Sequence, residues 1–394
     1  MIGIALLGST GSIGRSTLEV VGRHRDLFQV VALAANRRVD ELARQVERFR
    51  PAAAVVADTA AWDRSGGSPE ASEARWTSGR EEILALTRRP DVDVVVNALV
   101  GAAGLEVTLA ALEAGKRLAL ANKESLVAGG PLVLEAAARG GGQLVPVDSE
   151  HSAILQCIEG SPRASVGRLV LTASGGPFRG WNPERLRDVR PGDALRHPTW
   201  EMGAKITVDS ATLANKALEV IEAHFLYHGP YEDIDVVVHP QSIVHSFVEF
   251  VDGSVLAQVG MPTMELPILY ALSYPGRVAD RALRTFDPVR FSPLTFEEVD
   301  EVSFPLFGLG AQAGRRGGLA PAAFNAGNEV AVAAFLEERV RFTEMPDVVA
   351  GALAAVPPGE PRRVEDVLEA DRMARAAARA VVERLSRVET RRGS

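Results

Sequence analysis

Short apolar runs alternate with longer amphipathic stretches through the first third of the chain. Residues 2–7 and 30–34 are continuous apolar runs, which is typical of strands buried on both faces of a parallel sheet. Similar runs occur at 53–57, 92–97, 117–121 and 144–148. Helical patterns lie between the runs, and this alternation predicts an α/β fold that begins with a Rossmann-like dinucleotide-binding domain.

The pattern changes after residue 150. A helix is expected over 151–159, and strands are expected at 168–172, 234–238, 242–251 and 255–259. From about residue 297 the chain is helical and rich in alanine. These features predict a central α+β domain with a mixed sheet, followed by a C-terminal helical bundle.

A chain of 394 residues is too long for one ordinary core, so two or three domains are expected. The predicted parts are 1–148 for dinucleotide binding, 149–274 for catalysis with a lid loop at 174–204, 275–300 as a linker, and 301–394 as a helical domain. Residues 62–74 are expected to form an exposed loop, and the last four residues, RRGS, are expected to be disordered.

The stretch Thr207–Tyr227 predicts one helix with an unusual distribution of polar residues. Asp209 or Ser210 can cap its start. At about 100° per residue, the polar side chains fall in one narrow arc and apolar residues cover nearly all the rest. That arc holds Thr212, Asn215, Lys216, Glu219 and Glu222. The pattern fits a buried helix with a thin solvated edge, and it equally fits a buried helix that points polar groups into a cleft.

Composition excludes several classes of protein. The net charge of −8 and pI near 5.6 argue against a nucleic-acid-binding surface. The single cysteine, Cys157, cannot form an intramolecular disulfide and is expected in the core. No run of about 18 apolar residues occurs, so no membrane span is expected. The N-terminus has the pattern of a first strand and turn rather than a signal peptide, and a cytoplasmic enzyme is the expectation.

Three glycines follow the first apolar run and precede a helix. Gly8, Gly11 and Gly14 let the backbone approach a pyrophosphate at the positive end of a helix. The spacing GxxGxxG differs from the commoner GxGxxG, so a plain strand–helix turn is the alternative. After the second run, Arg37 and Arg38 stand where an acidic residue would hold the ribose of NAD, and two guanidinium groups suit the 2′-phosphate of NADP(H) instead.

Acidic residues suggest a cation site. Asp148 and Glu150 are two apart at the end of a predicted strand, so their side chains are expected to point the same way. With Glu219 they would form a set of three carboxylates, which repel one another unless a cation lies among them. All-oxygen ligation suits Mg²⁺ or Mn²⁺. The alternative is that Glu219 is one more solvated glutamate on a helix.

Two further features suggest a substrate site. The long Gly- and Pro-containing segment 174–204 is interpreted as a lid, because Trp200 and Met202 are unusual residues to leave in water. These two side chains are expected to cover a bound substrate. Lys123 follows a predicted strand and can serve a phosphate or a substrate hydroxyl, with a surface lysine as the alternative. His239 and His245 are interpreted as hydrogen-bonded structural residues.

Seven motifs, spread in order over nearly the whole chain, together resemble the 1-deoxy-D-xylulose 5-phosphate reductoisomerase family. They are GSTGSIG, LANKESLV, PVDSEHSA, ASGGPF, HPTWEMG, KITVDSATLANKALEVIEA and FNAGNEVAV. The chain departs from the family pattern at Asn36, where the family often has glycine, and residues 60–75 match no familiar motif.

The resemblance implies a set of roles for the residues of this chain. The divalent cation, Mn²⁺ or Mg²⁺ with Co²⁺ as a further candidate, would be held by Asp148, Glu150 and Glu219. The substrate would be bound by Lys123, Ser149, Glu150, Ser174, His197, Trp200, Met202, Ser210, Asn215, Lys216 and Glu219. NADPH would be bound by Gly8, Thr10, Gly11, Ser12, Ile13, Asn36, Arg37, Arg38, Asn122, Glu124 and Gly203. Lys123 would lie near the reacting carbons, so it joins the three acids as a catalytic residue.

The resemblance also implies a reaction and an assembly. The substrate would be 1-deoxy-D-xylulose 5-phosphate, rearranged and then reduced by NADPH to 2-C-methyl-D-erythritol 4-phosphate. A homodimer is implied, with no nucleic-acid or membrane partner. One alternative is an NADP-dependent dehydrogenase without rearrangement, which would leave the three acids without a role and would need no metal. Another is an NADP-sensing protein without turnover.

Overall fold

The computed structural model describes residues 1–67 and 72–392, with side chains described up to residue 387. By compactness the chain forms two units. The first comprises Met1–Ser125, Pro131–Ser152 and Thr263–Leu283, and the second comprises Leu126–Gly130, Ala153–Pro262 and Arg284–Ser394. The four-part functional division expected from the sequence stays a prediction.

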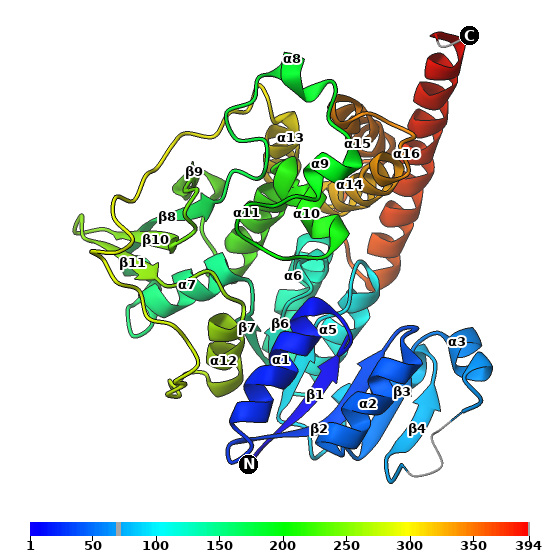
Figure 1. The fold of residues 1–394 in the computed structure, drawn as a ribbon, viewed down its shortest axis with the longest axis vertical. Helices are drawn as coiled ribbons and strands as arrows, with labels where there is room; N and C mark the ends of the chain where they lie inside the picture. The colour runs from blue at the N-terminus through cyan, green and yellow to red at the C-terminus, as the bar shows by residue number, and fades with distance from the viewer. Residues whose placement is uncertain (68–71, 393–394) are drawn as a thin grey trace. The chain divides into compact units, whose positions relative to one another are not determined.

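The first unit is built on a seven-stranded parallel sheet (Figure 1). Its strands are β1 (Ile2–Leu7), β2 (Phe28–Ala35), β3 (Ala53–Val56), β4 (Arg75–Ser78), β5 (Val94–Asn97), β6 (Arg117–Leu120) and β7 (Gln143–Pro146). They lie in the order β4-β3-β2-β1-β5-β6-β7. This confirms the predicted α/β architecture, with one strand missed: β4 has the sequence RWTS, which contains no apolar run.

Helices connect these strands. They are α1 (Ser12–Arg23), α2 (Val39–Phe49), α3 (Thr59–Arg64), α4 (Arg80–Thr87), α5 (Ala103–Glu113) and α6 (Lys123–Gly140), and α7 (Ser149–Ile158) follows β7. A later helix, α12 (Glu265–Ser273), packs on α1. Arg23 of α1 binds Glu265 at 2.7 Å and Asp280 at 2.8 Å, and these ion pairs tie the 263–283 segment to the first unit.

The strand order reverses between β1 and β5, which is where open α/β sheets bind ligands. The glycine turn lies at this point. Gly8 has φ +90°, and a Cβ there would lie 2.3 Å from the carbonyl oxygen of Ala98, just after β5. A Cβ on Gly14 would lie 2.4 Å from the carbonyl oxygen of Gly8. Both positions therefore require glycine, as the dinucleotide-site interpretation expects.

The second unit contains the smaller sheet. Its strands are β8 (Val166–Ala173), β9 (Ile234–Val238), β10 (Val244–Phe250) and β11 (Val255–Val259). They lie in the order β11-β10-β8-β9. The pair β8–β9 is parallel and the other pairs are antiparallel, so the predicted mixed sheet is confirmed.

The remaining helices of the second unit form its apolar core with the sheet. The short helices are α8 (Pro183–Leu186) and α9 (Pro191–Ala194), with 3-10 turns at Arg163–Ser165, Tyr231–Asp233 and Phe342–Glu344. The longer ones are α10 (Ala204–Ala211), α11 (Ala214–Tyr227), α13 (Pro305–Arg316), α14 (Ala320–Leu336), α15 (Met345–Ala355) and α16 (Val364–Arg392). Helices α14, α15 and α16 pack on one another, as the predicted helical bundle requires (Figure 1). Cys157 lies in this core, as expected.

Two local predictions are wrong. Residues 207–227 are not one helix, because Leu213 adopts a left-handed conformation with φ +58° and separates α10 from α11. Neither Asp209 nor Ser210 caps a helix start, since α10 already begins at Ala204 with Gly203 as its N-cap. Asp148 and Glu150 do not share a strand end: β7 ends at Pro146, and α7 already begins at Ser149.

Two expected irregular segments are partly helical. Helix α3 covers the start of the expected loop at 62–74, and residues 68–71 lie outside the described residues. Helix α16 continues to Arg392, and residues 393–394 of the expected disordered tail are likewise outside them. Among the residues that the structure describes, no helix is long and apolar enough to cross a membrane.

Close packing at Gly14 predicts a large effect of a single methyl group. Gly14→Ala should lower the free energy of unfolding by about 1–3 kcal/mol, because backbone atoms cannot move aside for the new Cβ. Gly22→Ala, in the same helix, is the matched control, since its Cβ would meet the end of the flexible Arg48 side chain at 3.3 Å and the Phe49 ring at an ordinary contact distance of 3.9 Å. The control should be neutral or more stable by up to about 1 kcal/mol. Equal denaturant midpoints for the two variants would contradict this account.

Candidate active site

The glycine turn and the start of α1 form the candidate pyrophosphate site in the first unit. Gly11 is the N-cap of α1, and Ser12 and Ile13 follow in its first turn. A first turn leaves backbone N–H groups without intrahelical partners, and these groups favour an anion. Thr10 is buried, and its carbonyl oxygen accepts a hydrogen bond from Arg38 Nη1 at 2.8 Å.

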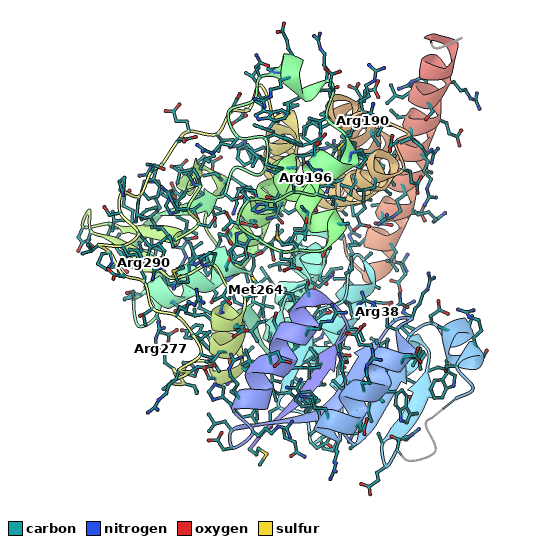
Figure 2. All side chains as sticks on the ribbon, in the orientation of Figure 1. Arg38, Arg190, Arg196, Met264, Arg277 and Arg290 are labelled. Carbon is teal, nitrogen blue, oxygen red and sulfur yellow. The ribbon has the colours of Figure 1, made fainter. Side chains whose placement is uncertain are left out.

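Arginines surround a neighbouring cavity of about 510 Å³. Arg38 lies where β2 leads into α2 (Figure 2), and Arg37 Nε donates to Asp58 Oδ2 at 2.6 Å. Arg44 of α2 and Arg64 of α3 line the same cavity. The sequence did not reveal these two arginines, because each lies on a separate helix. Four guanidinium groups around one cavity fit a phosphate monoester such as the 2′-phosphate.

Asn122 and Glu124 lie at the start of α6. Asn122 caps this helix, since its Oδ1 accepts from Ser125 N at 3.0 Å. Its Nδ2 donates to the carbonyl oxygens of Leu99 and Gly101 and to Glu124 Oε2. The Asn122 side chain thus holds the loop after β5 against α6, so it shapes the edge of the sheet where a nicotinamide ring would be expected.

The first unit also brings together Lys123, Asp148 and Glu150. Neighbouring strands β6 and β7 end at the same sheet edge, which places Lys123 beside Asp148 with Nζ–Oδ2 at 2.8 Å. Glu150 N donates to Asp148 Oδ1 at 3.3 Å, and Ser149 Oγ donates to Glu150 Oε2 at 2.5 Å. Lys123 is buried, so the alternative of a surface lysine is wrong. One ammonium and two carboxylates therefore share this sheet edge.

The second unit joins Ser174 and His197 in a hydrogen-bonded pair. His197 Nδ1 accepts from the backbone N–H groups of Thr199 at 3.1 Å and Trp200 at 2.9 Å. An acceptor Nδ1 means that the ring is neutral and carries its proton on Nε2, which donates to Ser174 Oγ at 3.0 Å. Ser174 Oγ also accepts from Gly176 N at 3.2 Å. Its own O–H is then directed toward a further acceptor, such as a phosphate oxygen.

Glu219 is at the centre of a second polar cluster in this unit. The Nδ2 of Asn215 donates to one carboxylate oxygen of Glu219, and Lys216 Nζ binds the other. Glu219 is only 1% exposed, so the interpretation of a solvated glutamate is wrong. The helix break places Ser210 in the last turn of α10 and Asn215 in the first turn of α11.

The other predicted residues of the second unit lie around the segment that precedes α10. Gly203 is the N-cap of α10, and its carbonyl oxygen accepts from Thr207. Trp200 and Met202 are half-buried, and the Trp200 ring centroid lies 6.5 Å from that of His245. His239 Nδ1 lies 2.8 Å from the carbonyl oxygen of Thr295, as the structural interpretation of this histidine expects.

Comparison with known proteins decides the family. Family models match at residues 4–130 (1-deoxy-D-xylulose 5-phosphate reductoisomerase), 144–227 (its C-terminal domain) and 259–377 (DXP reductoisomerase C-terminal domain). The reductoisomerase of Gloeobacter violaceus is 50% identical over 392 residues, which covers 97% of each chain. This chain belongs to the 1-deoxy-D-xylulose 5-phosphate reductoisomerase family.

Other members of the reductoisomerase family are also similar to this chain, in sequence and in fold. The protein from Crocosphaera subtropica is 49% identical over 381 residues, covering 95% of each chain. The solved structure of the Zymomonas mobilis reductoisomerase in complex with NADPH has a TM-score of 0.90 at 40% identity and covers 97% of this chain and 99% of that one. A further reductoisomerase structure, with NADPH, fosmidomycin and magnesium, has a TM-score of 0.89 at 38% identity and covers 97% and 98%. The resemblance and the fold class inferred from the sequence are confirmed.

The hydrogen bonds of His197 predict its titration. Burial lowers the pKa of His197 below its ordinary value, and the two backbone donors at Nδ1 also disfavour a proton there. The unfolded side chain has a pKa near 6.5, so the stability that neutral His197 contributes is complete above about pH 6.5 and is lost as the pH falls through the folded pKa. NMR titration should give a pKa below about 6.5. His197→Gln should lose less stability than the wild type between pH 7.5 and 5.5, and parallel pH profiles would contradict the assignment.

Proposed function

We propose that this chain converts 1-deoxy-D-xylulose 5-phosphate into 2-C-methyl-D-erythritol 4-phosphate with NADPH and a divalent cation. The reaction belongs to the non-mevalonate route to isoprenoid precursors. The observation that carries the proposal is 50% identity over 97% of both chains with a reductoisomerase. The polar clusters described above supply the residue chemistry that such a reaction needs.

NADPH fits the first unit. Gly8 and Gly14 form a turn that a Cβ would fill, and the arginine-lined cavity beside it is suited to the 2′-phosphate. The residues proposed to bind NADPH are Gly8, Thr10, Gly11, Ser12, Ile13, Asn36, Arg37, Arg38, Asn122 and Glu124, with Gly203 from the second unit. The bound cofactor would supply hydride, while the protein orients the nicotinamide and excludes water.

A hard divalent cation fits the carboxylates. Asp148, Glu150 and Glu219 are candidates to hold it, and oxygen donors suit Mg²⁺ or Mn²⁺, with Co²⁺ as a further possibility. The bound cation would act as a Lewis acid on the substrate ketone and an adjacent hydroxyl. Lys123, next to Asp148, would donate to the substrate near the reacting carbons, and Ser149 would bind a substrate hydroxyl.

The substrate phosphate fits the polar groups of the second unit. Ser174 has its O–H available for an acceptor, and Lys216 contributes an ammonium group close to Asn215 on the same turn. His197, in its neutral form, fixes the Ser174 hydroxyl. Ser210 completes the proposed set, and Trp200 and Met202 would cover the bound substrate as a lid and exclude water.

The decisive experiment follows NADPH oxidation with 1-deoxy-D-xylulose 5-phosphate in the presence and absence of Mn²⁺. Turnover that requires both substrate and metal, with 2-C-methyl-D-erythritol 4-phosphate as product, supports the proposal. Metal-independent reduction of a sugar or aldehyde substrate would favour a dehydrogenase. NADPH binding without any turnover would favour an NADP-sensing protein.

We also propose that the protein is a cytoplasmic homodimer that pairs through the smaller sheet. β11 is an edge strand of that sheet, and Val255 and Leu256 are 54% and 49% exposed. An apolar, unpaired strand edge is a surface that proteins usually cover. A molar mass of twice 42.0 kDa in light scattering would agree with the dimer.

The arginine-lined cavity predicts cofactor selectivity. Arg38→Ala should weaken NADPH binding about 10- to 100-fold and leave NADH binding unchanged, because only NADPH carries the 2′-phosphate. Arg88→Ala, an exposed arginine outside the cavity, is the control and should bind both cofactors as the wild type does. Fluorescence titration measures both affinities. A parallel loss of NADH and NADPH binding would refute the assigned role.

The buried carboxylate predicts metal dependence. Glu219→Gln keeps the size of the side chain but removes its charge, so it should weaken Mn²⁺ binding strongly and reduce turnover at low Mn²⁺. Activity should recover partly at high Mn²⁺ by mass action. Glu232→Gln, an exposed glutamate, is the control. Mn²⁺ titrations of both variants at fixed substrate and NADPH show whether Glu219 binds the metal. Superimposable curves would exclude Glu219 as a ligand.

A further inference from the structure

The break between α10 and α11 has no glycine or asparagine to explain it. Leu213 adopts φ +58° and ψ 11°, a left-handed conformation that is unfavourable for leucine, and its side chain is buried. Such a residue persists only where its surroundings determine the backbone. The contacts that hold Leu213 in place therefore affect the backbone geometry of α10 and α11, the two helices that meet at the break.

The break lies within three residues of two proposed phosphate ligands. Ser210 precedes it in α10, and Asn215 follows it in the first turn of α11. In one continuous helix these two residues would differ by about 140° around the axis, since five residues turn a helix by about 500°. The geometry of the break thus decides how the two side chains are directed.

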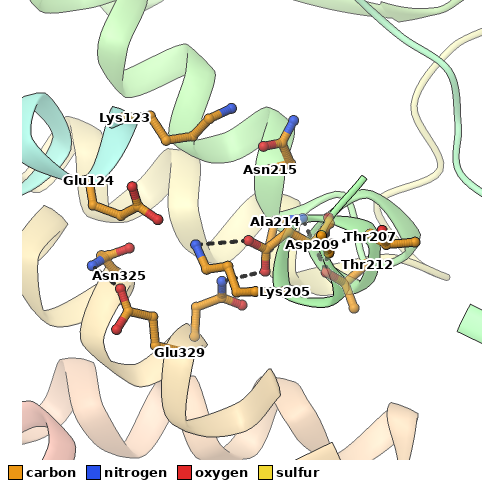
Figure 3. A network of polar contacts seen from close by, with 12 residues as sticks. Lys123, Glu124, Lys205, Thr207, Asp209, Thr212, Ala214, Asn215, Asn325 and Glu329 are labelled. Atoms are coloured by element: carbon orange, nitrogen blue, oxygen red, sulfur yellow. Dashed lines mark hydrogen bonds and ion pairs between the residues drawn. The ribbon is translucent and has the colours of Figure 1, made fainter. Parts of the chain in front are cut away.

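Polar contacts between residues close to the break help to hold its geometry. Thr212 Oγ1 donates to the carbonyl oxygen of Asp209 at 3.2 Å and accepts from Ala214 N at 3.3 Å (Figure 3). The carboxylate of Asp209 is buried, and Lys205 Nζ lies 2.9 Å from its Oδ2 (Figure 3). These contacts are local to the two helices.

One contact comes from far along the chain. Asn328 Nδ2 donates to Asp209 Oδ1 at 2.7 Å, and both side chains are buried. Asn328 belongs to α14, which packs on α15 and α16. Its neighbour Glu329 binds Arg375 of α16 at 2.6 Å. The packing of α14 on α15 and α16 therefore holds Asn328 in place.

We propose that Asn328 is a positioning residue for the substrate phosphate. It fixes the carboxylate of Asp209, and with Thr212 it sets the α10–α11 break, which directs Ser210 and Asn215. This role rests on the proposed phosphate site. A purely structural hydrogen bond would affect stability but would not affect phosphate binding selectively.

The test compares two variants, each of which removes a different contact that holds the α10–α11 break. Asn328→Ala removes the long-range contact, and Thr212→Val removes the local hydroxyl at nearly constant volume. Thr212→Ser keeps the hydroxyl and should behave as the wild type does. Arg375→Met is the matched control, because it disrupts a polar contact of the same helix α14 that does not reach Asp209.

Three measurements on the full-length protein are needed: equilibrium titration with inorganic phosphate, the KM and kcat for 1-deoxy-D-xylulose 5-phosphate, and the NADPH dissociation constant. Asn328→Ala and Thr212→Val should each weaken phosphate binding and raise KM about tenfold, the loss expected for a displaced ligand to a charged group. The kcat should stay within about threefold and NADPH affinity should be unchanged. Arg375→Met should lower Tm and leave phosphate binding intact.

Phosphate affinities of Asn328→Ala and Thr212→Val within twofold of the wild type would overturn the proposal, as would equal losses of phosphate and NADPH binding. If Asn328→Ala does not fold, the Thr212→Val and Thr212→Ser pair decides the role of the break that Asn328 serves. Failure of the proposed function is a separate result: the wild type would then bind phosphate but would not turn over the sugar phosphate.

Discussion

A buried carboxylate needs a positive charge or several hydrogen-bond donors beside it, and the candidate site is organised by this requirement. Asp148 has Lys123, Glu219 has Lys216 and Asn215, and Asp209 has Lys205 and Asn328. Two of the lysines lie three or four residues from their acid on the same helix. At the proposed metal site, an incoming divalent cation would compete with Lys123 for Asp148 and with Lys216 for Glu219.

The chemistry is divided between the two units. The first supplies the turn and arginines suited to NADPH together with Asp148 and Glu150, and the second supplies Glu219 and the groups suited to a phosphate. The residues proposed to take part in the reaction therefore belong to both units. In the proposed phosphate site, a neutral His197 would orient the Ser174 hydroxyl without adding a charge that varies near neutral pH.

The sequence predicts what depends on periodicity. Apolar runs identify the buried strands, and the narrow polar arc identifies Glu219 as unusual before any partner is known. Prediction from the sequence fails where long-range contacts override the local pattern. β4 is an edge strand without an apolar run, and the helix break occurs at Leu213, where the sequence has no glycine or asparagine to indicate it. Arg44 and Arg64 join Arg37 and Arg38 only after α2 and α3 are placed, so no local signal could reveal them.

Helix α6 is kinked where the chain passes from the first unit to the second and back. Pro131 lies inside this helix and removes the hydrogen bond to the carbonyl group of residue 127, and Gly129 has the non-helical angles φ −120° and ψ 20°. The chain changes unit on both sides of this kink, at Ser125 and at Pro131. A Cβ on Gly130 would lie 2.4 Å from the ring of Phe225 on α11, so the absence of a side chain at Gly130 lets this short segment pack in the second unit. Within the second unit, the segment Leu126–Gly130 thus packs on α11, and the Gly-Gly-Pro sequence at 129–131 allows both this contact and the kink.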